Sequence, residues 1–216
     1  MDIETYKRTF AADDSAPGWE AIDARLKEFY GDQEPRHLGT SHPYALGGPD
    51  PLDGISIYRS TQSETHLHFV TYGMSELYYA EESVGAEYSR CGFEFSFRLI
   101  PSGNGENELW VAHLLQNIAR YVYSSKKWFE AYHYIPANGP ICLGAETEVT
   151  ALATVLDPEL GSIETVHGRV DFIQFMGIAQ REYDLLRAGD VKCEEFMRAE
   201  HKANPFFLTR LNRGGS

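Results

Sequence analysis

The sequence predicts an α+β fold in which a mixed, largely antiparallel β-sheet is flanked by helices. Runs with a period of two, typical of β-strands, occur early and late in the chain. One long segment with helical periodicity, residues 108–125, lies between them. Because strands follow strands here and do not alternate regularly with helices, we expect antiparallel pairing to dominate the sheet.

Three segments have apolar residues at helical spacing. Residues 17–30 predict the opening helix, and Pro17 suits its first turn. Residues 108–125 predict a helix whose apolar stripe packs on the sheet. Residues 180–199 predict two shorter helices separated at Gly189, because glycine commonly ends a helix.

Five segments have the composition of strands. Residues 52–60 and 65–73 are β-branched and aromatic runs joined by a short polar connection, so we expect a hairpin. Residues 91–100 alternate most clearly between apolar and polar side chains. Residues 149–156 and 162–175 predict two further strands. Together these runs are sufficient for one sheet.

The clearest alternation predicts which side chains of residues 91–100 are buried. Phe93, Phe95 and Phe97 share one face of the strand, which we expect to lie in the core. Glu94 and Ser96 point to the opposite face.

The composition describes a folded chain of 216 residues with an acidic surface. Hydrophobic residues make up 43% and aromatic residues 13%, which is ample for a buried core. Lys and Arg number 19 against 32 Asp and Glu, which gives a formal net charge of −13. This charge repels nucleic acid and anionic lipid and attracts basic partners, so we expect no nucleic-acid partner and no membrane partner.

A single domain is expected over residues 17–210, with an N-terminal extension at 1–16 and a polar tail at 211–216. No apolar run reaches the ~20 residues of a membrane helix, and the N-terminus lacks the apolar core of a signal peptide. The three cysteines are odd in number and have no CxxC spacing, which fits reduced thiols. We therefore expect a cytoplasmic protein.

Two histidines are the strongest candidates for catalytic or metal chemistry. His66 and His68 point to the same side of a strand, so they could offer two imidazoles to one metal ion. A metal site needs a further ligand, and His113 and His133 lack a recognisable ligand spacing. A packed, hydrogen-bonded strand histidine is the more common structure, so we expect no metal site.

Other catalytic patterns are absent from the sequence. There is no GxSxG elbow, Cys142 lies in no known nucleophile signature, and no cofactor fingerprint is complete. We expect no catalytic residue and no cofactor.

Tyrosines and carboxylates gather after the second strand of the expected hairpin. Tyrosine rings supply rigid contact area, and carboxylates attract basic side chains. We expect an exposed groove or sheet edge here, where a partner segment could add as a strand. The alternative is that Tyr78 and Tyr79 only cap the sheet edge. The candidate partner-binding residues are Tyr72, Glu76, Tyr78, Tyr79, Glu81 and Glu82.

Five sequence blocks, in this order and spacing, resemble the suppressor of fused domain family. They are "GGPDPLDGISIYRS", "HLHFVTYGMSELY", "GFEFSFRL", "LLQNIARYVYSS" and "VDFIQFMGIAQREYDLL". The resemblance extends from about Gly18 to Leu186. It implies a mixed sheet with flanking helices and a function in binding other proteins without catalysis. The second, C-terminal domain of eukaryotic members has no counterpart in these 216 residues.

The resemblance favours a short bacterial member of inhibitory or immunity type. Such members resemble immunity proteins, which neutralise toxins by binding them, and the acidic composition suits a basic toxin. The expected partner is therefore another protein, either a basic toxin or a regulatory protein. The alternative function is a metal-dependent or hydrolytic enzyme that uses His66 and His68.

The segment "GGPDPLD", residues 47–53, is interpreted as a stiff turn that leads into a strand. Its prolines fix φ, its glycines allow positive φ, and its aspartates can accept hydrogen bonds from nearby backbone. A role of this turn in binding stays open.

Overall fold

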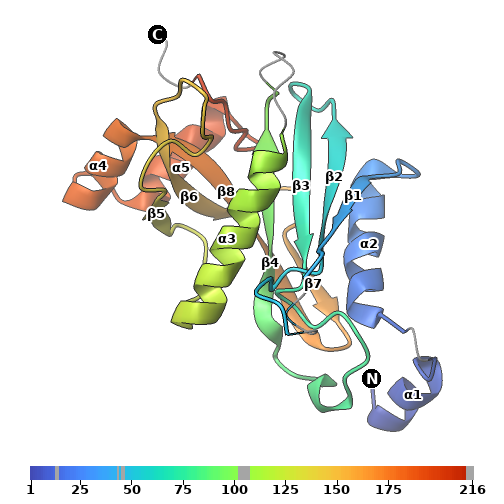
Figure 1. Ribbon diagram of the computed structural model, residues 1–216. Helices are drawn as coiled ribbons and strands as arrows, with labels where there is room; N and C mark the ends of the chain where they lie inside the picture. Colours follow the sequence, from blue (N-terminus) through green and yellow to red (C-terminus); the bar gives the residue numbers. More distant parts are fainter. Residues whose placement is uncertain (13–14, 43, 45–46, 102–107, 213–216) are drawn as a thin grey trace.

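The chain folds into an open β-sheet with helices on both of its faces (Figure 1). The structure, a computed structural model, describes residues 1–12, 15–42, 44, 47–101 and 108–212. The strands are β1 (Arg36–Gly39), β2 (Gly54–Ser60), β3 (His66–Tyr72), β4 (Tyr88–Leu99), β5 (Tyr134–Pro136), β6 (Val149–Leu156), β7 (Ser162–Thr165) and β8 (Gly168–Ala179). The helices are α1 (Ile3–Thr9), α2 (Pro17–Tyr30), the 3₁₀ turn η2 (Glu81–Ser83), α3 (Leu109–Ser125), α4 (Gln180–Ala188) and α5 (Cys193–Ala203).

The sheet is mixed and largely antiparallel, so the predicted α+β fold is confirmed. Its strand order is β1-β2-β3-β4-β8-β6-β5, and β7 pairs with part of β8. Only β4 and β8 pair in parallel among the described strands. The expected hairpin is present as β2 and β3, and the three helical predictions are confirmed by α2, α3 and the pair α4 and α5.

Helix α3 covers one face of the sheet. Phe95 and Phe97 are fully buried on this face and Phe93 nearly so, as the alternation predicts. Leu115 and Ile118 of α3 belong to the same apolar cluster. The apolar stripe of α3 is therefore part of the core.

Helices α2, α4 and α5 cover the opposite face. Ile22 and Leu26 of α2 are fully buried in a cluster with Tyr72 of β3. Glu94 and Ser96 face this side, as predicted, but they are fully buried as well. Both faces of β4 are therefore covered, and its polar side chains need partners inside the protein.

The short strands β1, β5 and β7 and the short helix α1 were not expected from the sequence. Residues 162–175 predict one strand, but the chain turns at Val166 and His167 to form the hairpin of β7 and β8, and Gly168, the first residue of β8, has φ of +105°. The edge strands β1 and β5 have three or four residues each, and neither has a fully buried residue, so they lack an alternating pattern of apolar and polar side chains. Helix α1 lies within the expected N-terminal extension.

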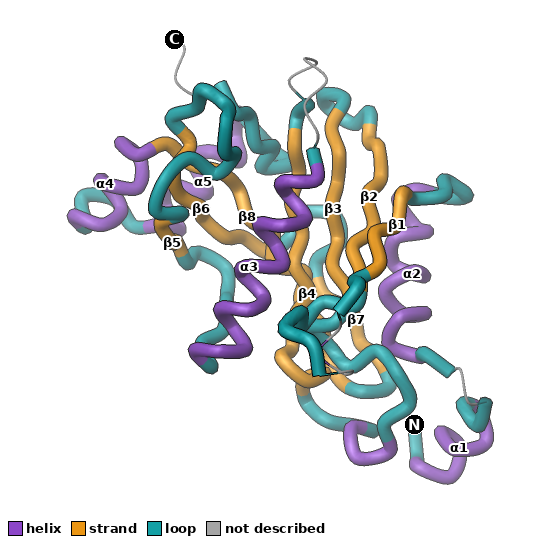
Figure 2. Tube along the Cα trace, in the orientation of Figure 1, coloured by secondary structure: helices purple, strands orange, loops and turns teal. Residues whose placement is uncertain are grey.

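The loops between β1 and β2 and between β3 and β4 gather at one end of the sheet, beside α1 (Figure 2). The end of the expected tail, residues 213–216, lies outside the described residues. Within the described part of the chain, no helix is long and apolar enough to span a membrane.

Candidate functional site

The turn at residues 47–53 is tied to the sheet by backbone hydrogen bonds. The Asp53 N–H donates to the Tyr72 carbonyl at 2.8 Å, and the Asp53 carbonyl accepts from Thr40 at 2.9 Å. Gly73 packs so closely on this turn that a Cβ at that position would lie 2.7 Å from the Pro51 carbonyl oxygen. These contacts give the turn a structural role at the end of β3.

Tyr72 does not belong to an exposed surface, so this part of the predicted site is wrong. Its side chain is fully buried, stacks on Trp19 with ring centroids 4.3 Å apart and donates to Asp23 at 2.7 Å. The reason is that α2 lies over this face of β3. Strand addition at β3 is also excluded, because β2 and β4 flank it on both sides.

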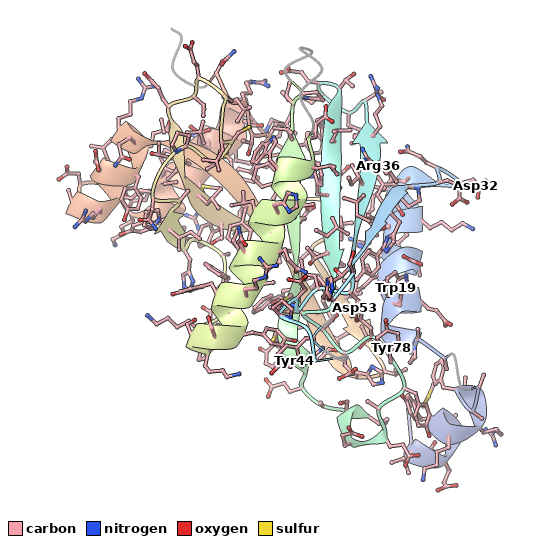
Figure 3. The ribbon with its side chains drawn as sticks, in the orientation of Figure 1. Trp19, Asp32, Arg36, Tyr44, Asp53 and Tyr78 are labelled. Atoms are coloured by element: carbon pink, nitrogen blue, oxygen red, sulfur yellow. The ribbon has the colours of Figure 1, made fainter. Side chains whose placement is uncertain are left out.

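The rest of the predicted group lies in the loop after β3. Tyr78 and Tyr79 are 47% and 38% exposed. Tyr78 is hydrogen-bonded to Asp53, and Figure 3 shows these two residues at the end of the sheet where the loops gather. Glu76 is half-buried and Glu82 is exposed. Their role in binding remains a prediction.

Helix α1 already covers part of this loop. Tyr6 of α1 is fully buried and stacks on Tyr79 with centroids 4.9 Å apart. Its hydroxyl accepts a hydrogen bond from the Ala80 N–H at 2.9 Å. Lys7 forms an ion pair with Glu81 at 2.9 Å, and Glu81 also accepts from Tyr79 at 2.7 Å. Because α1 covers part of the Tyr79 ring, a partner that binds this loop would contact α1 as well as Tyr79.

His66 and His68, the predicted alternative for chemistry, lie in a buried polar network. His68 contacts Tyr30 Oη through Nδ1 at 2.7 Å and Asp157 Oδ2 through Nε2 at 3.1 Å. His66 contacts the Glu64 carbonyl through Nδ1 at 2.7 Å and Arg98 through Nε2 at 3.3 Å. All four imidazole nitrogens thus have protein partners, and the guanidinium beside them opposes a metal cation.

One buried guanidinium pairs with two carboxylates in this network. Arg98 is fully buried and donates to Asp157 at 3.0 Å and to Glu159 at 2.7 Å. Burial and the adjacent guanidinium lower the pKa of His68 to about 4, so the ring is neutral at neutral pH. The Arg98 and His68 contacts hold the pKa of Asp157 well below its usual range despite burial. Among the described residues, no group of three or more His, Cys, Asp or Glu is placed to hold a metal ion.

The structure brings together a second surface that the sequence analysis missed. We call it the Trp128 surface, and its exposed side chains are Tyr88, Tyr121, Trp128, Tyr132 and Leu156. Trp128 is 63% exposed, which is unusual for the largest apolar side chain. It lines three adjoining hollows of about 380, 570 and 620 Å³. The surface therefore combines exposed aromatic rings with concave shape.

The backbone under the Trp128 surface is firmly held. Phe129 is buried against Phe95 and Phe175, with ring centroids 6.1 and 5.1 Å apart. The Tyr132 N–H donates to the Thr154 carbonyl at 2.7 Å. Tyr132 adopts φ of +69°, a conformation that is rare and costly for a residue other than glycine. The anchoring of Phe129 turns Trp128 outward.

Both signs of charge surround the Trp128 surface. Arg90 lies over the ring of Tyr123 at 5.5 Å, and Lys126 lies over the same ring at 5.9 Å. Glu130 and Asp171 contribute negative charge. Tyr, Trp and Arg are the residue types most often found at energetically important interface positions. The sequence signal was the aromatic-rich segment 128–134, which has no strand or helix period.

This fold and these surfaces define a class of protein: an α+β domain that is covered on both sheet faces and carries aromatic surfaces suited to contact with other proteins. The chain belongs to the suppressor of fused protein family, whose model matches residues 48–214. The predicted family resemblance is thereby confirmed.

Relatives from mammals match nearly the whole chain. The suppressor of fused homologs of Homo sapiens and Mus musculus are each 30% identical over 210 residues, which cover 91% of this chain and 43% of the relative. The chain thus spans less than half the length of these curated relatives.

Solved structures show the same fold. A chain from the Sufu–Fu complex crystal structure has a TM-score of 0.83 and 28% identity, with 93% of this chain and 92% of that chain covered. Drosophila Suppressor of Fused has a TM-score of 0.78 and 28% identity, with 93% and 51% covered. A homolog from Neisseria gonorrhoeae has a TM-score of 0.61 at 13% identity, with 92% and 96% covered, and shows the fold alone.

Proposed function

We propose that this chain is a non-catalytic, inhibitory protein of immunity type that sequesters a partner protein, and that it contacts this partner through the Trp128 surface. The observation that carries the proposal is Trp128 itself, a 63% exposed tryptophan that lines three adjoining hollows. Burial of such a ring in an interface contributes roughly 2 kcal/mol or more. The description of one related structure as a Sufu–Fu complex supports a protein partner.

The net charge of −13 supports a basic partner, such as a basic toxin. A cytoplasmic location suits this role, because a protein that neutralises an intracellular toxin acts where the toxin acts. The two parts of the proposal can be separated, because contact through Trp128 does not require that the partner is basic.

The test begins with recovery of the partner from cells and measurement of its binding to purified variants. Trp128→Ala should weaken binding at least tenfold without lowering the melting temperature. Leu143→Ala is the matched control, because Leu143 is 89% exposed and lines none of the three hollows. Equal affinity of Trp128→Ala and the wild type would exclude this surface.

Tyr79→Ala and Glu81→Lys test the loop after β3 in the same assay. A loss of affinity in these two variants, with Trp128→Ala unaffected, would place the partner on that loop. The sequestering role predicts that the partner loses its own activity in a stoichiometric complex. A partner that stays fully active in the complex would contradict inhibition.

Metal analysis of protein purified without a histidine tag tests the enzymatic alternative. A tightly held, stoichiometric zinc or iron ion would favour an enzyme that uses His66 and His68. No contact of these two side chains in the structure favours it, because their ring nitrogens are all engaged.

A further inference from the structure

The outer edge of β1 has no strand partner in the described part of the chain, because β1 ends the sheet and pairs with β2 alone. The Thr40 N–H donates to the Asp53 carbonyl at 2.9 Å, so Thr40 faces β2. By the alternation of an antiparallel ladder, the backbone N–H and C=O groups of His37 and Gly39 point away from β2. These groups can hydrogen-bond an extended segment.

A groove of about 360 Å³ lies beside this edge, between α2 and β1. We call it the α2–β1 groove, and its lining includes Trp19, Asp23, Lys27, Asp32, Glu34 and His37. Figure 3 shows Trp19, Asp32 and Arg36 along this side of the molecule. The lining thus contains three carboxylates and only one ammonium group, that of Lys27. Lys27 lies 3.7 Å from Asp32, whose side chain is still 98% exposed.

The floor of the groove is aromatic. Trp19 is held by its stack on Tyr72 and lies 5.3 Å from the ring of His37. Desolvation lowers the pKa of His37, so its ring is uncharged at neutral pH and does not repel a cation. The face of a tryptophan ring is the best aromatic partner for a Lys or Arg side chain. The groove therefore offers a cation both charge and an aromatic surface.

The two faces of an added strand would meet different surroundings. On the α2 side, its side chains would face the α2–β1 groove. On the other side they would lie next to Leu38, which packs against the apolar cluster under α3. An occupant that suits both faces has Lys or Arg at every second position and apolar residues between them.

We propose that the outer edge of β1 binds an extended, basic segment of another protein, which adds as a strand and directs alternate Lys or Arg side chains into the α2–β1 groove. Charge complementarity selects this occupant. The inference deepens the proposed function, since it names a second contact for a basic partner, but it does not depend on the Trp128 surface.

A synthetic peptide tests the inference without the natural partner. The probe is a capped eight-residue peptide that alternates lysine with valine, and its dissociation constant is measured by fluorescence anisotropy. The first control is a peptide of the same composition with the four lysines in one block. The second is the alternating peptide with every backbone nitrogen methylated, which keeps the charge and removes the backbone donors of lysine and valine alike. We expect the alternating peptide to bind at least tenfold more tightly than either control.

Charge reversal on the protein locates the peptide. Asp32→Lys combined with Glu34→Lys should weaken binding at least tenfold, and both residues are exposed, so folding should be retained. The matched control is Glu146→Lys with Asp190→Lys, which changes the net charge equally at exposed positions away from the groove. Trp128→Ala should leave binding unchanged.

Four outcomes would overturn the inference. Equal binding of the block or N-methylated peptide would exclude strand addition. Equal weakening by the two charge reversals would show a general effect of net charge. A dimer in solution that Asp32→Lys with Glu34→Lys dissociates would make a second copy the occupant of the edge. Weaker peptide binding by Trp128→Ala would show that the peptide binds the Trp128 surface and not the edge of β1. This result would contradict the inference but not the proposed function.

Discussion

Asp157 shows how single residues make a fully covered sheet possible. Its carboxylate accepts hydrogen bonds from Ser96 at 2.8 Å, from the backbone N–H groups of Glu159 and Leu160 at 2.9 Å each, and from Arg98. Arg98 and Asp157 form a buried ion pair. Removal of one partner of a buried ion pair leaves the other charge uncompensated, which typically lowers the free energy of unfolding by roughly 3 to 5 kcal/mol. The network therefore constrains β3, β4 and the loop after β6 together.

Acidification should destabilise the protein through His68. Its pKa is about 4 in the folded chain, against about 6.5 in the unfolded chain. Between these values the unfolded chain binds a proton that the folded chain does not, so the free energy of unfolding falls as the pH falls. The loss from this group alone is about 2 kcal/mol between pH 7 and pH 5.

Urea denaturation at the two pH values measures this loss. His68→Gln keeps an acceptor and a donor but does not titrate, so its stability should fall by about 2 kcal/mol less than that of the wild type over the same range. Equal pH dependence of the two proteins would contradict the neutral, buried His68.

Glu94 should be sensitive even to conservative substitution. It is fully buried, and its oxygens accept from the backbone N–H groups of Gly73, Met74 and Ser75 and from the hydroxyls of Thr71 and Ser75, at 2.6 to 3.1 Å. Burial raises the pKa of Glu94, and these hydrogen bonds oppose the rise.

Glu94→Gln places an amide N–H₂ group among these donors, so buried donors lose their acceptor. We expect a cost of roughly 2 to 4 kcal/mol in the free energy of unfolding, because each unsatisfied buried group costs about 1 to 3 kcal/mol. Chemical denaturation at pH 7 measures it. A loss below about 0.5 kcal/mol, the range of ordinary surface substitutions, would show that the loop does not depend on the charge.

At the scale of elements, β4 carries the main core contacts. Phe95 is fully buried and contacts Phe93 and Phe175, each with ring centroids 5.2 Å apart. Phe95→Ala should cost roughly 3 to 5 kcal/mol, the range for loss of a buried phenylalanine. Thermal unfolding measures this cost, and Phe95→Leu serves as the smaller change. An unchanged melting temperature of Phe95→Ala would contradict the central place of β4.

Periodicity explains which elements could be predicted from the sequence. Helix α3 is long and repeats one pattern throughout, and strand β4 alternates regularly from Phe93 to Leu99, so the local sequence was sufficient there. Strands β1 and β5 are short and have no fully buried residue, and their pairing depends on β2 and β6, each of which follows only after a long loop. Residues 162–175 predict one strand because the turn between β7 and β8 is short and interrupts the strand-like sequence only briefly.

The candidate site was less predictable, because exposure depends on what covers a side chain. Tyr72 and Tyr79 lie in one aromatic segment, yet α2 buries the first and α1 covers part of the second. The local sequence around Tyr72 and Tyr79 does not show that α2 and α1 pack on these side chains. Trp128 reads as a core residue by its type, and only the anchoring of its neighbour Phe129 turns it outward.

At the scale of the whole molecule, charge is distributed unevenly. The α2–β1 groove is acidic, whereas lysines and arginines border the Trp128 surface. The net charge of −13 determines the long-range attraction of a basic partner. The binding energy at contact depends instead on the side chains that the partner touches. The rate of association and the lifetime of a complex should therefore depend on different residues.

Salt should affect association with a basic partner more than dissociation. Between 0.1 and 1 M salt the Debye length falls from about 10 to about 3 Å, so the field of the acidic chain no longer steers the partner. We expect the association rate constant to fall at least tenfold and the dissociation rate constant to change less. Trp128→Ala should produce the opposite pattern, because loss of a buried ring acts after contact. Surface-based kinetic measurements on the recovered partner distinguish the two patterns, and salt that acts only on dissociation would refute electrostatic steering by this chain.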